Sequence, residues 1–415
     1  DNEMSIAENH GGLYQNLKEL RDTEGRSSCN FFRSLGLDYL YVGEGNDIPS
    51  LIAAFAKVKD TSRPTVVHIH TQKGKGYAPA EADREEFHWE MPFDLETGKP
   101  KVDCSGMEDY HSLTGKFLLE KMKEDHTVVA ISSGTPTVIG FTPERRKQAG
   151  RQFVDVGIAE EHAVALASGI AAGGGRPVYG VYSTFIQRCY DQLSQDLCIN
   201  GNPAVITVFM GTVAGMNDVT HLGFFDIPLI SNIPNMVYLA PTCSEEYFAM
   251  LEWAVRQTEY PVAIRVPGAA VVHRKEEFDT DYSELNRYKM TARGETVAIL
   301  ALGAFYDLGQ ALKNKLREES GVEATLINPR YITGLDEPML EELKVGHRIV
   351  VTLEDGVLDG GFGEKIARYY GNSEMRVLNY GLRKEFADRY NLDELMKANR
   401  LTDKQMAEDI AGILE

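Results

Sequence analysis

One carboxylate stands where an alternating segment gives way to a helical one. Residues 153–158 alternate like a short strand, and from Ala159 apolar residues recur at helical spacing until the glycines at 173–175 end the pattern. Glu160 therefore falls in the first turn of a predicted helix, where the helix dipole favours an anion. Such apolar surroundings suit a carboxyl group that must hold or pass a proton. An acid that merely complements the dipole would occupy the same position.

A second group of polar residues follows a predicted strand at 65–71. Lys73 and Lys75 alternate with glycines, which let a backbone approach a phosphate while lysine supplies charge. Tyr77 follows, and His88 comes eleven residues later. Histidine titrates near neutral pH and so suits proton transfer. Alone these signals are weak, because most Gly-Lys loops are solvated turns and most loop histidines face solvent.

Aromatic and basic side chains gather behind two further predicted strands. Tyr182 and Phe185 offer aromatic faces to a planar ring, and Arg188 with Asp191 offers polar groups beside it. His221 lies in the loop after the strand at 204–210. Ordinary packing at strand ends is the competing interpretation.

Strands alternate with helices along the whole chain, which predicts an α/β fold with parallel sheets. The helix at 48–57 places apolar residues at Ile48, Leu51, Ile52 and Phe55, between strands at 39–42 and 65–71. Charged or Pro- and Gly-containing linkers at 89–108 and 274–283 separate three predicted domains. Their expected bounds are 1–105, 106–285 and 286–415.

The bulk composition is that of an ordinary globular protein. The 415 residues are 43% hydrophobic and 25% charged, and the net charge of -19 disfavours nucleic acid or an anionic membrane as a partner. No apolar run approaches the roughly 20 residues of a membrane span, and no signal peptide is seen. The cysteines are odd in number and lack close pairing, which predicts a reduced, cytoplasmic protein without a zinc site. They are Cys29, Cys104, Cys189, Cys198 and Cys243.

The segments 156–164 and 182–192 are similar to the pyrimidine-binding domain of transketolase-like thiamine diphosphate enzymes, above all the 1-deoxy-D-xylulose-5-phosphate synthases. This resemblance implies that Glu160 hydrogen-bonds the aminopyrimidine ring of thiamine diphosphate, so that the ring takes the proton from the thiazolium carbon. It also implies three domains of transketolase type and a homodimer. The third domain is expected to support dimerisation and to add little to the site.

The opening residues 1–6 resemble the end of the family's thiamine diphosphate motif. The resemblance implies that the Asn2 side chain and the Met4 main-chain carbonyl help to hold Mg²⁺, an ion that prefers hard oxygen ligands. The Gly-Asp-Gly half of the motif is missing, so the first domain is expected to be truncated. A fragment, one subunit of a split enzyme and a degenerate relative all remain open. Residues 22–28 also replace several dozen family residues, as a true deletion or as a gap.

The resemblance assigns further roles. It places Lys73, Tyr77, Tyr182, Phe185 and Arg188 beside the cofactor, and it makes His88 and His221 the residues that transfer protons.

The family's phosphate-binding arginines are absent. Met210 and Gly268 stand where the family has them, Arg265 is kept, and Asn46 replaces a histidine. Losing two arginine–phosphate contacts is expected to weaken a phosphorylated acceptor about a hundredfold or more, unless Arg188, Arg265 or the missing segment compensates.

The implied activity is decarboxylation of pyruvate and transfer of the two-carbon unit to an aldehyde, a step of isoprenoid biosynthesis. The aldehyde is glyceraldehyde 3-phosphate or, given the lost arginines, an unphosphorylated or differently shaped one. Two alternatives stay open: a transketolase or split-transketolase subunit that transfers a ketol group, and a catalytically silent scaffold paralogue.

Overall fold

The computed structural model describes residues 1–102, 106–268 and 270–414. Cys104, one of the thiols expected to be reduced, lies outside these ranges. The chain forms two compact units, one of Asp1–Met107 with Asp155–Ile158 and the other of Glu108–Val154 with Ala159–Glu415.

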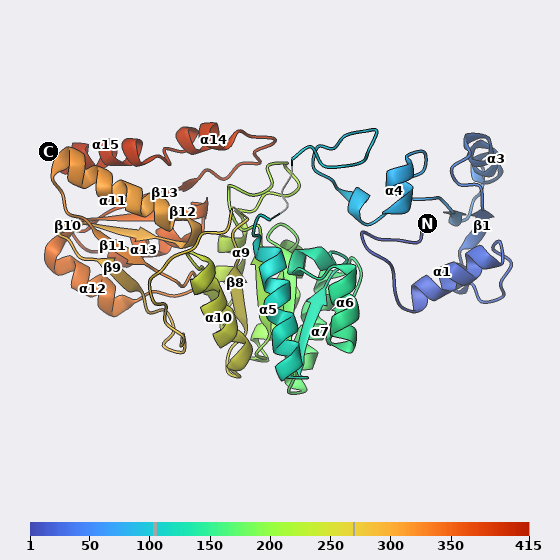
Figure 1. The fold of residues 1–415 in the computed structure, drawn as a ribbon, viewed down its shortest axis with the longest axis horizontal. Coiled ribbons are helices and arrows are strands. Elements are labelled where there is room, and N and C mark those ends of the chain that lie inside the picture. The colour runs from blue at the N-terminus through green and yellow to red at the C-terminus, as the bar shows by residue number, and fades with distance from the viewer. Residues whose placement is uncertain (103–105, 269, 415) are drawn as a thin grey trace. The chain divides into compact units, whose positions relative to one another are not determined.

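The N-terminal unit contains a parallel pair of strands joined by a helix, as the alternation predicts (Figure 1). Strand β1 (Asp38–Val42) pairs with β2 (Thr65–Ile69), and α3 (Ile48–Val58) connects them. Asp47 caps α3 by accepting a hydrogen bond from Ser50 N at 2.8 Å. The other elements are α1 (Gly12–Asp22), α2 (Phe31–Ser34), α4 (Ala78–Ala82) and the 3₁₀ turn η1 (Glu86–His88).

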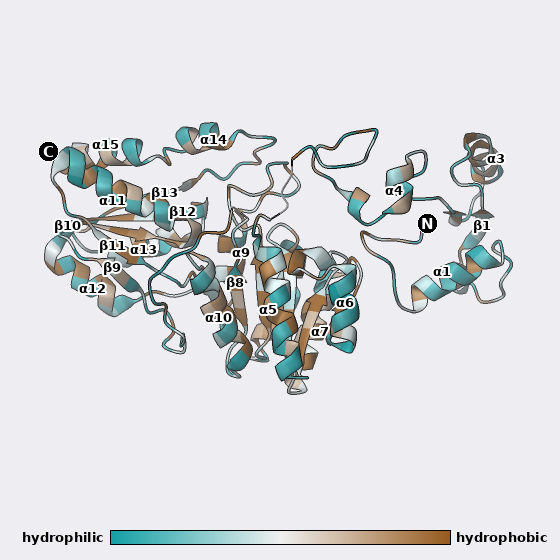
Figure 2. Cartoon of the chain, viewed as in Figure 1, coloured by the Kyte–Doolittle hydropathy of each residue, from teal (hydrophilic) through white to brown (hydrophobic). Residues whose placement is uncertain are grey.

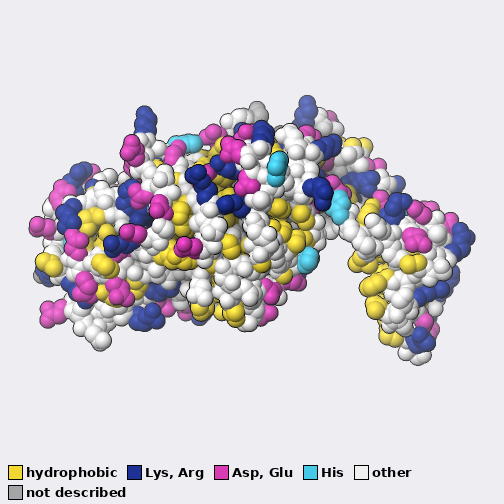
Figure 3. Space-filling view, turned by 90° about the horizontal axis from the view of Figure 1, so that it is seen from below, with side chains coloured by type: hydrophobic (Ala, Val, Ile, Leu, Met, Phe, Trp, Pro, Cys, Tyr) yellow, Lys and Arg dark blue, Asp and Glu magenta, His cyan; other side chains and the backbone are white. Residues whose placement is uncertain are grey.

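The apolar face of α3 is not buried within this unit. Ile48 is 69% exposed, Ile52 65% and Phe55 49%, whereas Ala54 on the same helix is buried. Figure 3 shows hydrophobic side chains on the surface of this unit. Parallel strands are usually covered on both faces. The spacing of apolar residues therefore predicted the helix, and its face finds no cover among the described residues of the unit.

The middle sheet, within the described residues, has six strands in the order β4-β3-β5-β6-β8-β7, and the registered pairs from β3 to β7 run parallel. Its strands are β3 (Val128–Ser132), β4 (Phe153–Asp155), β5 (Arg176–Tyr182), β6 (Val205–Phe209), β7 (Val237–Leu239) and β8 (Val262–Arg265). Its helices are α5 (Tyr110–Glu124), α6 (Pro143–Ala149), α7 (Glu160–Ala172), α8 (Tyr190–Gln192), α9 (Asp226–Ser231) and α10 (Ser244–Arg256). Shorter helical turns are η2 (Pro136–Ile139), η3 (Gly150–Gln152), η4 (Ile186–Cys189) and the π-helix η5 (Leu193–Cys198).

The C-terminal sheet has the order β13-β12-β10-β11-β9 among the described residues, and its edge strand β9 runs antiparallel to β11. Its strands are β9 (Lys289–Ala292), β10 (Thr296–Ala301), β11 (Thr325–Asn328), β12 (His347–Val357) and β13 (Arg376–Leu382). Its helical elements are η6 (Gly303–Phe305), α11 (Tyr306–Ser320), α12 (Glu337–Gly346), α13 (Phe362–Tyr370), α14 (Leu392–Ala398) and α15 (Asp403–Leu414). Gly360 makes the predicted tight turn before α13 with φ 72.

Both large sheets have apolar strands beneath helices with polar outer faces, as Figure 2 shows. The predicted fold class of parallel-sheet α/β domains is thus confirmed, with β9 as the antiparallel exception. Within the described part of the chain, no helix combines the length and the apolar character that a bilayer crossing requires.

Candidate active site

Glu160 is the first residue of α7, as the sequence pattern predicts, and it is only 3% exposed. Arg188 of η4, which follows β5, donates from Nη1 to Glu160 Oε2 at 3.0 Å. A buried carboxylate needs such a partner, and the helix N-terminus adds further stabilisation. Asp191 lies exposed on α8. The polar network expected around Arg188 is therefore centred on its pair with Glu160.

The side chains behind Glu160 stay uncharged. Cys189 is fully buried, and burial, reinforced by the negative charges of Glu160 and Glu161, raises the pKa of its thiol to about 12. Burial likewise holds the pKa of Tyr179 far above its ordinary value, and its hydroxyl lies 2.8 Å from Ser133 Oγ. The Glu160 carboxyl group thus has uncharged side chains near it, and Arg188 is its counterion.

An aromatic row runs along the carboxyl ends of β5 and β6. The ring of Tyr182 lies 5.7 Å from that of Phe185, and Phe185 lies 5.4 Å from His221, both in edge-to-face contact. These three residues, predicted separately from the sequence, are therefore brought together. Carboxyl ends of parallel strands are where α/β sheets bind ligands.

His111 extends this row, and no sequence motif indicates it. Its ring stacks on Phe209 at 4.8 Å and meets Tyr182 edge-on at 6.2 Å. Nδ1 lies 2.6 Å from the Val138 carbonyl oxygen, which can only accept, so Nδ1 carries the proton. Burial lowers the pKa of His111, which makes it a neutral member of the wall.

His221 is held by its own loop. Asp218 Oδ2 lies 3.2 Å from His221 Nδ1, and Thr220 Oγ1 lies 2.8 Å from the same nitrogen. Hydrogen bonds from Thr220, together with His221, lower the pKa of Asp218. An ionised carboxylate on one ring nitrogen fixes the orientation of the imidazole and leaves Nε2 to face a ligand.

A cavity of about 290 Å³ adjoins this row. It is lined by Thr184, which precedes Phe185 in the chain, and by Thr220 and Leu222, which flank His221. Ser183 is 4% exposed, and its Oγ has no hydrogen-bond partner among the described residues. The described lining includes no lysine or arginine, and its one acid, Asp226, is bound to Arg265. The lining residues are Ser183, Thr184, Gln187, Val219, Thr220, Leu222, Phe225, Asp226, Leu229 and Phe386.

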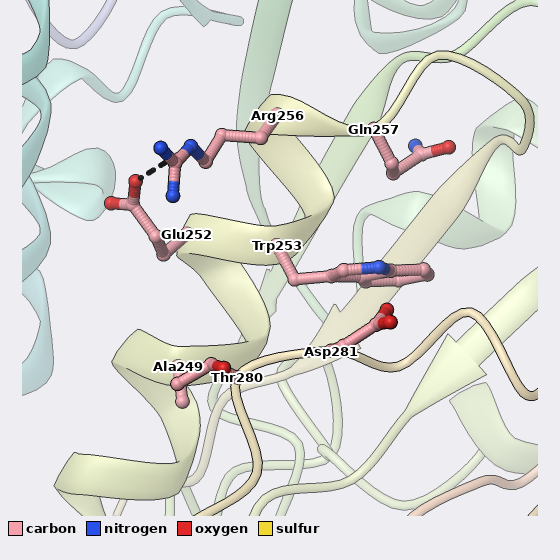
Figure 4. A pocket seen from close by; sticks show the side chains of 7 residues that line it. All are labelled: Ala249, Glu252, Trp253, Arg256, Gln257, Thr280 and Asp281. Carbon is pink, nitrogen blue, oxygen red and sulfur yellow. Dashed lines mark ion pairs between the residues drawn. The ribbon is translucent and has the colours of Figure 1, made fainter.

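Another cavity, of about 430 Å³, lies beside α10 (Figure 4). Trp253 and Asp281 line it together with Arg256, whose Nε lies 3.5 Å from Glu252 Oε1. None of the candidate residues lines this cavity, and we assign it no part in the site.

Arg265 cannot replace the missing phosphate-binding guanidiniums. It is 4% exposed, and its Nε donates to Asp226 Oδ2 at 2.7 Å. Its Nη2 donates to the carbonyl oxygens of Asp355 at 2.6 Å and Gly223 at 3.1 Å. Met210 packs against Gly268 nearby, so neither position supplies a charge. The expectation that Arg265 could bind the acceptor's phosphate in place of the lost arginines is therefore wrong, because its donors already bind buried groups of the core.

In the N-terminal unit, the side chains of Asn2 and Lys73 both bind main-chain groups of residues 4–6. Asn2 Oδ1 accepts from Met4 N at 3.1 Å, and Lys73 Nζ donates to the carbonyl oxygens of Ser5 at 3.3 Å and Ile6 at 3.2 Å. Burial lowers the pKa of Lys73. Asn2 Oδ1 and the Met4 carbonyl are hard oxygens of the kind Mg²⁺ accepts, although two oxygens fill only part of an octahedral shell.

Tyr77 and His88 lie further along the same unit. The Tyr77 hydroxyl is buried without a hydrogen-bond partner among the described residues, and its ring meets Phe87 at 5.7 Å. An orphaned buried hydroxyl fits a contact with a bound group. His88 ends η1, and partial desolvation, with the charge of Lys73, lowers its pKa.

A cavity of about 330 Å³ opens at the carboxyl ends of β1 and β2. Asn46, which stands for the family's histidine, lines it and accepts from Gln72 N at 2.8 Å. Its charged lining residues are of both signs, Lys75 and Arg84 with Glu3 and Glu44. Across the described residues, no cluster of three or more His, Cys, Asp or Glu side chains is arranged to hold a metal.

Two family models match this chain. The transketolase pyrimidine-binding domain matches residues 108–271, and the transketolase C-terminal domain matches residues 287–406. A 1-deoxy-D-xylulose-5-phosphate synthase of Clostridium botulinum is 32% identical over 443 residues, covering 96% of this chain and 69% of that protein. One of Alkaliphilus oremlandii is 33% identical, with coverages of 99% and 71%.

Solved structures support the same fold. A split-gene transketolase described as an inactive β4 tetramer superposes with a TM-score of 0.62 at 21% identity, covering 72% of this chain and 96% of that one. A Pichia stipitis transketolase in complex with sedoheptulose-7-phosphate gives a TM-score of 0.60 at 15% identity, with coverages of 92% and 67%. The chain therefore belongs to the transketolase family of thiamine diphosphate-dependent transferases and is similar to its 1-deoxy-D-xylulose-5-phosphate synthases.

Proposed function

We propose that this enzyme decarboxylates pyruvate and joins the two-carbon unit to an aldehyde, the chemistry indicated by the names of its relatives. The observation that carries the proposal is the buried Glu160, which begins α7 and is paired with Arg188. A carboxyl group held at a fixed position can hydrogen-bond the cofactor's aminopyrimidine ring, which is the role that the resemblance implies for Glu160. Thiamine diphosphate, when bound, supplies the electron sink for cleaving the bond to pyruvate's carboxyl carbon.

The chain's own residues would then divide the work. Glu160 holds a proton at the aminopyrimidine ring, and Arg188 keeps its carboxylate in place. Tyr182 and Phe185 flank the ring and exclude water. His221, oriented by Asp218, exchanges a proton with the acceptor's carbonyl oxygen.

The N-terminal unit would contribute the remaining contacts. Asn2 Oδ1 and the Met4 carbonyl are the proposed Mg²⁺ ligands, and diphosphate oxygens, water and further ligands would complete the shell. Lys73 and Tyr77 would contact the cofactor, and His88 would handle a proton of the substrate. A homodimer is also part of the proposal, and light scattering of the purified protein measures it.

We further propose that the acceptor is an unphosphorylated or otherwise uncharged aldehyde. The described lining of the cavity beside Phe185 and His221 includes no lysine or arginine. Arg265 is committed to Asp226 and Asp355, and Met210 meets Gly268 where the family has guanidiniums. A phosphate would therefore lack bidentate partners at these three positions.

The decisive experiment measures CO₂ release from labelled pyruvate, with glyceraldehyde and with glyceraldehyde 3-phosphate as acceptors. We expect release that depends on thiamine diphosphate and a lower KM for glyceraldehyde. A low micromolar KM for the phosphorylated aldehyde would contradict the acceptor proposal alone. Ketol transfer from a sugar phosphate without CO₂ release from pyruvate would favour an ordinary transketolase. Absence of cofactor binding in calorimetry would favour the silent scaffold.

A further inference from the structure

The loop of residues 211–223 carries His221, and we call it the His221 loop. Its apolar side chains are buried in the core of the C-terminal sheet rather than in that of the middle sheet. Val213 and Leu222 are each 3% exposed and pack in one cluster with residues of β10 and β12, such as Ile299 and Leu353. The loop thus depends on a part of the chain far from it in sequence.

A short segment after β13 binds the backbone of this loop. We call residues 386–390 the C-terminal strap. Tyr390 Oη donates to the carbonyl oxygen of Val213 at 2.8 Å, and the Met216 carbonyl oxygen lies 3.4 Å from the same hydroxyl. Arg389 N donates to the Asn217 carbonyl at 2.6 Å. These contacts reach three carbonyl groups of irregular backbone that belongs to no helix or strand.

Further bonds run in both directions between strap and loop. Asp388 Oδ1 accepts from Val219 N at 3.2 Å, and Asn217 Nδ2 donates to the Tyr390 carbonyl at 3.0 Å. From β12, Asp355 Oδ1 accepts from Val213 N at 2.8 Å. The Val213 amide is buried and needs such a partner, whereas the bonds at Asn217 and Val219 are exposed and fix the loop's position rather than satisfy a buried group. Burial raises the pKa of Tyr390 to about 12, so its hydroxyl remains a donor at working pH.

The bonded positions surround the residue that orients the histidine. Asn217 and Val219 are the two chain neighbours of Asp218, whose carboxylate lies 3.2 Å from His221 Nδ1. A small shift of these neighbours moves the carboxylate, and the imidazole moves with it. Placement within about half an ångström matters for a group that transfers a proton.

We propose that the C-terminal strap positions Asp218 and His221 for the acceptor step, with Tyr390 and Asp388 as positioning residues. This differs from the expectation that the third domain adds little to the site. The proposal rests on the proposed function for the meaning of His221. The contacts between strap and loop can be tested without it.

The first test compares two tyrosine variants of the full chain. Tyr390→Phe removes the bonds to the loop and keeps the ring, whereas Tyr370→Phe removes an equivalent buried bond to the Leu340 carbonyl, 2.7 Å long, in the same domain. We expect Tyr390→Phe alone to speed hydrogen exchange of amides 212–220. We also expect it to raise the acceptor KM about fivefold, the worth of one such bond, with CO₂ release in the absence of acceptor unchanged.

The second test uses rescue at the other positioning residue. Asp388→Ala removes the acceptor for Val219 N, and Asp388→Asn keeps an oxygen there, so the alanine variant should show the same two changes and the asparagine variant should not. Unchanged exchange in Tyr390→Phe and Asp388→Ala would overturn the proposal. Equal loss of acceptor-independent CO₂ release in the tyrosine variants would also overturn it. A protein that turns over no pyruvate would refute the proposed function and leave the exchange result to decide on the strap.

Discussion

Met210 occupies the space that any side chain at position 268 would need. A Cβ atom on Gly268 would lie 2.4 Å from Met210 Sδ, closer than such atoms approach, and 3.2 Å from Met210 Cα, which is a tight contact. The two positions where the family has phosphate-binding arginines are therefore neighbours here. Glycine at position 268 leaves room for the Met210 side chain, and neither residue carries a charge.

This relationship predicts that a phosphate site returns only when both residues change. Gly268→Arg alone should clash with Met210 and lower the melting temperature. Met210→Arg with Gly268→Arg restores both guanidiniums, and we expect it to lower the KM for glyceraldehyde 3-phosphate by about a hundredfold, which corresponds to two bidentate contacts. Steady-state kinetics with both aldehydes measure this. The double variant's KM for glyceraldehyde, expected to change little, is the control.

Glu160 and Glu161 form a matched pair for testing cofactor activation. Glu160 is buried and paired with Arg188, whereas Glu161 is exposed on the same turn. We expect Glu160→Gln to reduce turnover of pyruvate about 10²- to 10⁴-fold, because the amide cannot hold the proton in the same way. Glu161→Gln should stay within about twofold of the parent. Undiminished turnover in Glu160→Gln would refute the proposed activation.

Arg265 provides a test of structural against ligand-binding roles. Replacing it with methionine leaves Asp226 and Asp355 buried without their cation. We expect a loss of about 3–5 kcal/mol in the free energy of unfolding, the usual result of removing one partner from a buried charge pair. Urea denaturation measures this. A variant of unchanged stability but raised KM for a phosphorylated acceptor would instead give Arg265 the ligand-binding role.

Much of the fold followed from local pattern. The strand ending at Asp155, the turn and the helix from Glu160 to Ala172 form where alternation changes to helical spacing, and α7 ends at Gly173 as predicted. Such short-range signals are reliable because each depends on neighbouring residues. The sequence placed Tyr182 and Phe185 after one predicted strand and His221 after another, but their edge-to-face contacts came only from the structure.

Long-range partners were beyond the sequence pattern. The apolar spacing of α3 predicts a helix, but it carries no information on what covers Ile48 and Ile52. Likewise, nothing in the residues around Tyr390 indicates a bond to Val213, 177 positions away. The Arg265 guanidinium looked free for a phosphate until Asp226 and Asp355 were placed beside it. Pairings of this kind are set by packing between distant elements.

Asp355 gives the protein a pH dependence that can be isolated. Two buried carboxyl groups, Asp226 and Asp355, share the single guanidinium of Arg265, and burial raises the pKa of Asp355 to about 6. The folded state therefore binds this proton more tightly than the unfolded chain, whose aspartate pKa is about 4. Protonation of Asp355 therefore contributes its full share to the free energy of unfolding below about pH 4, and this contribution is lost as pH rises through 6.

Asparagine at this position cannot ionise, yet its oxygen still accepts from Val213 N. We expect Asp355→Asn to gain stability relative to the parent as pH rises from 4 to 6, by up to about 3 kcal/mol. Urea unfolding midpoints across this range measure the difference. Asp359→Asn, which breaks only an exposed pair with Lys384, is the control and should follow the parent. If Asp355→Asn also follows the parent, Asp355 is ionised throughout, because Arg265 then holds its charge more strongly than burial opposes it.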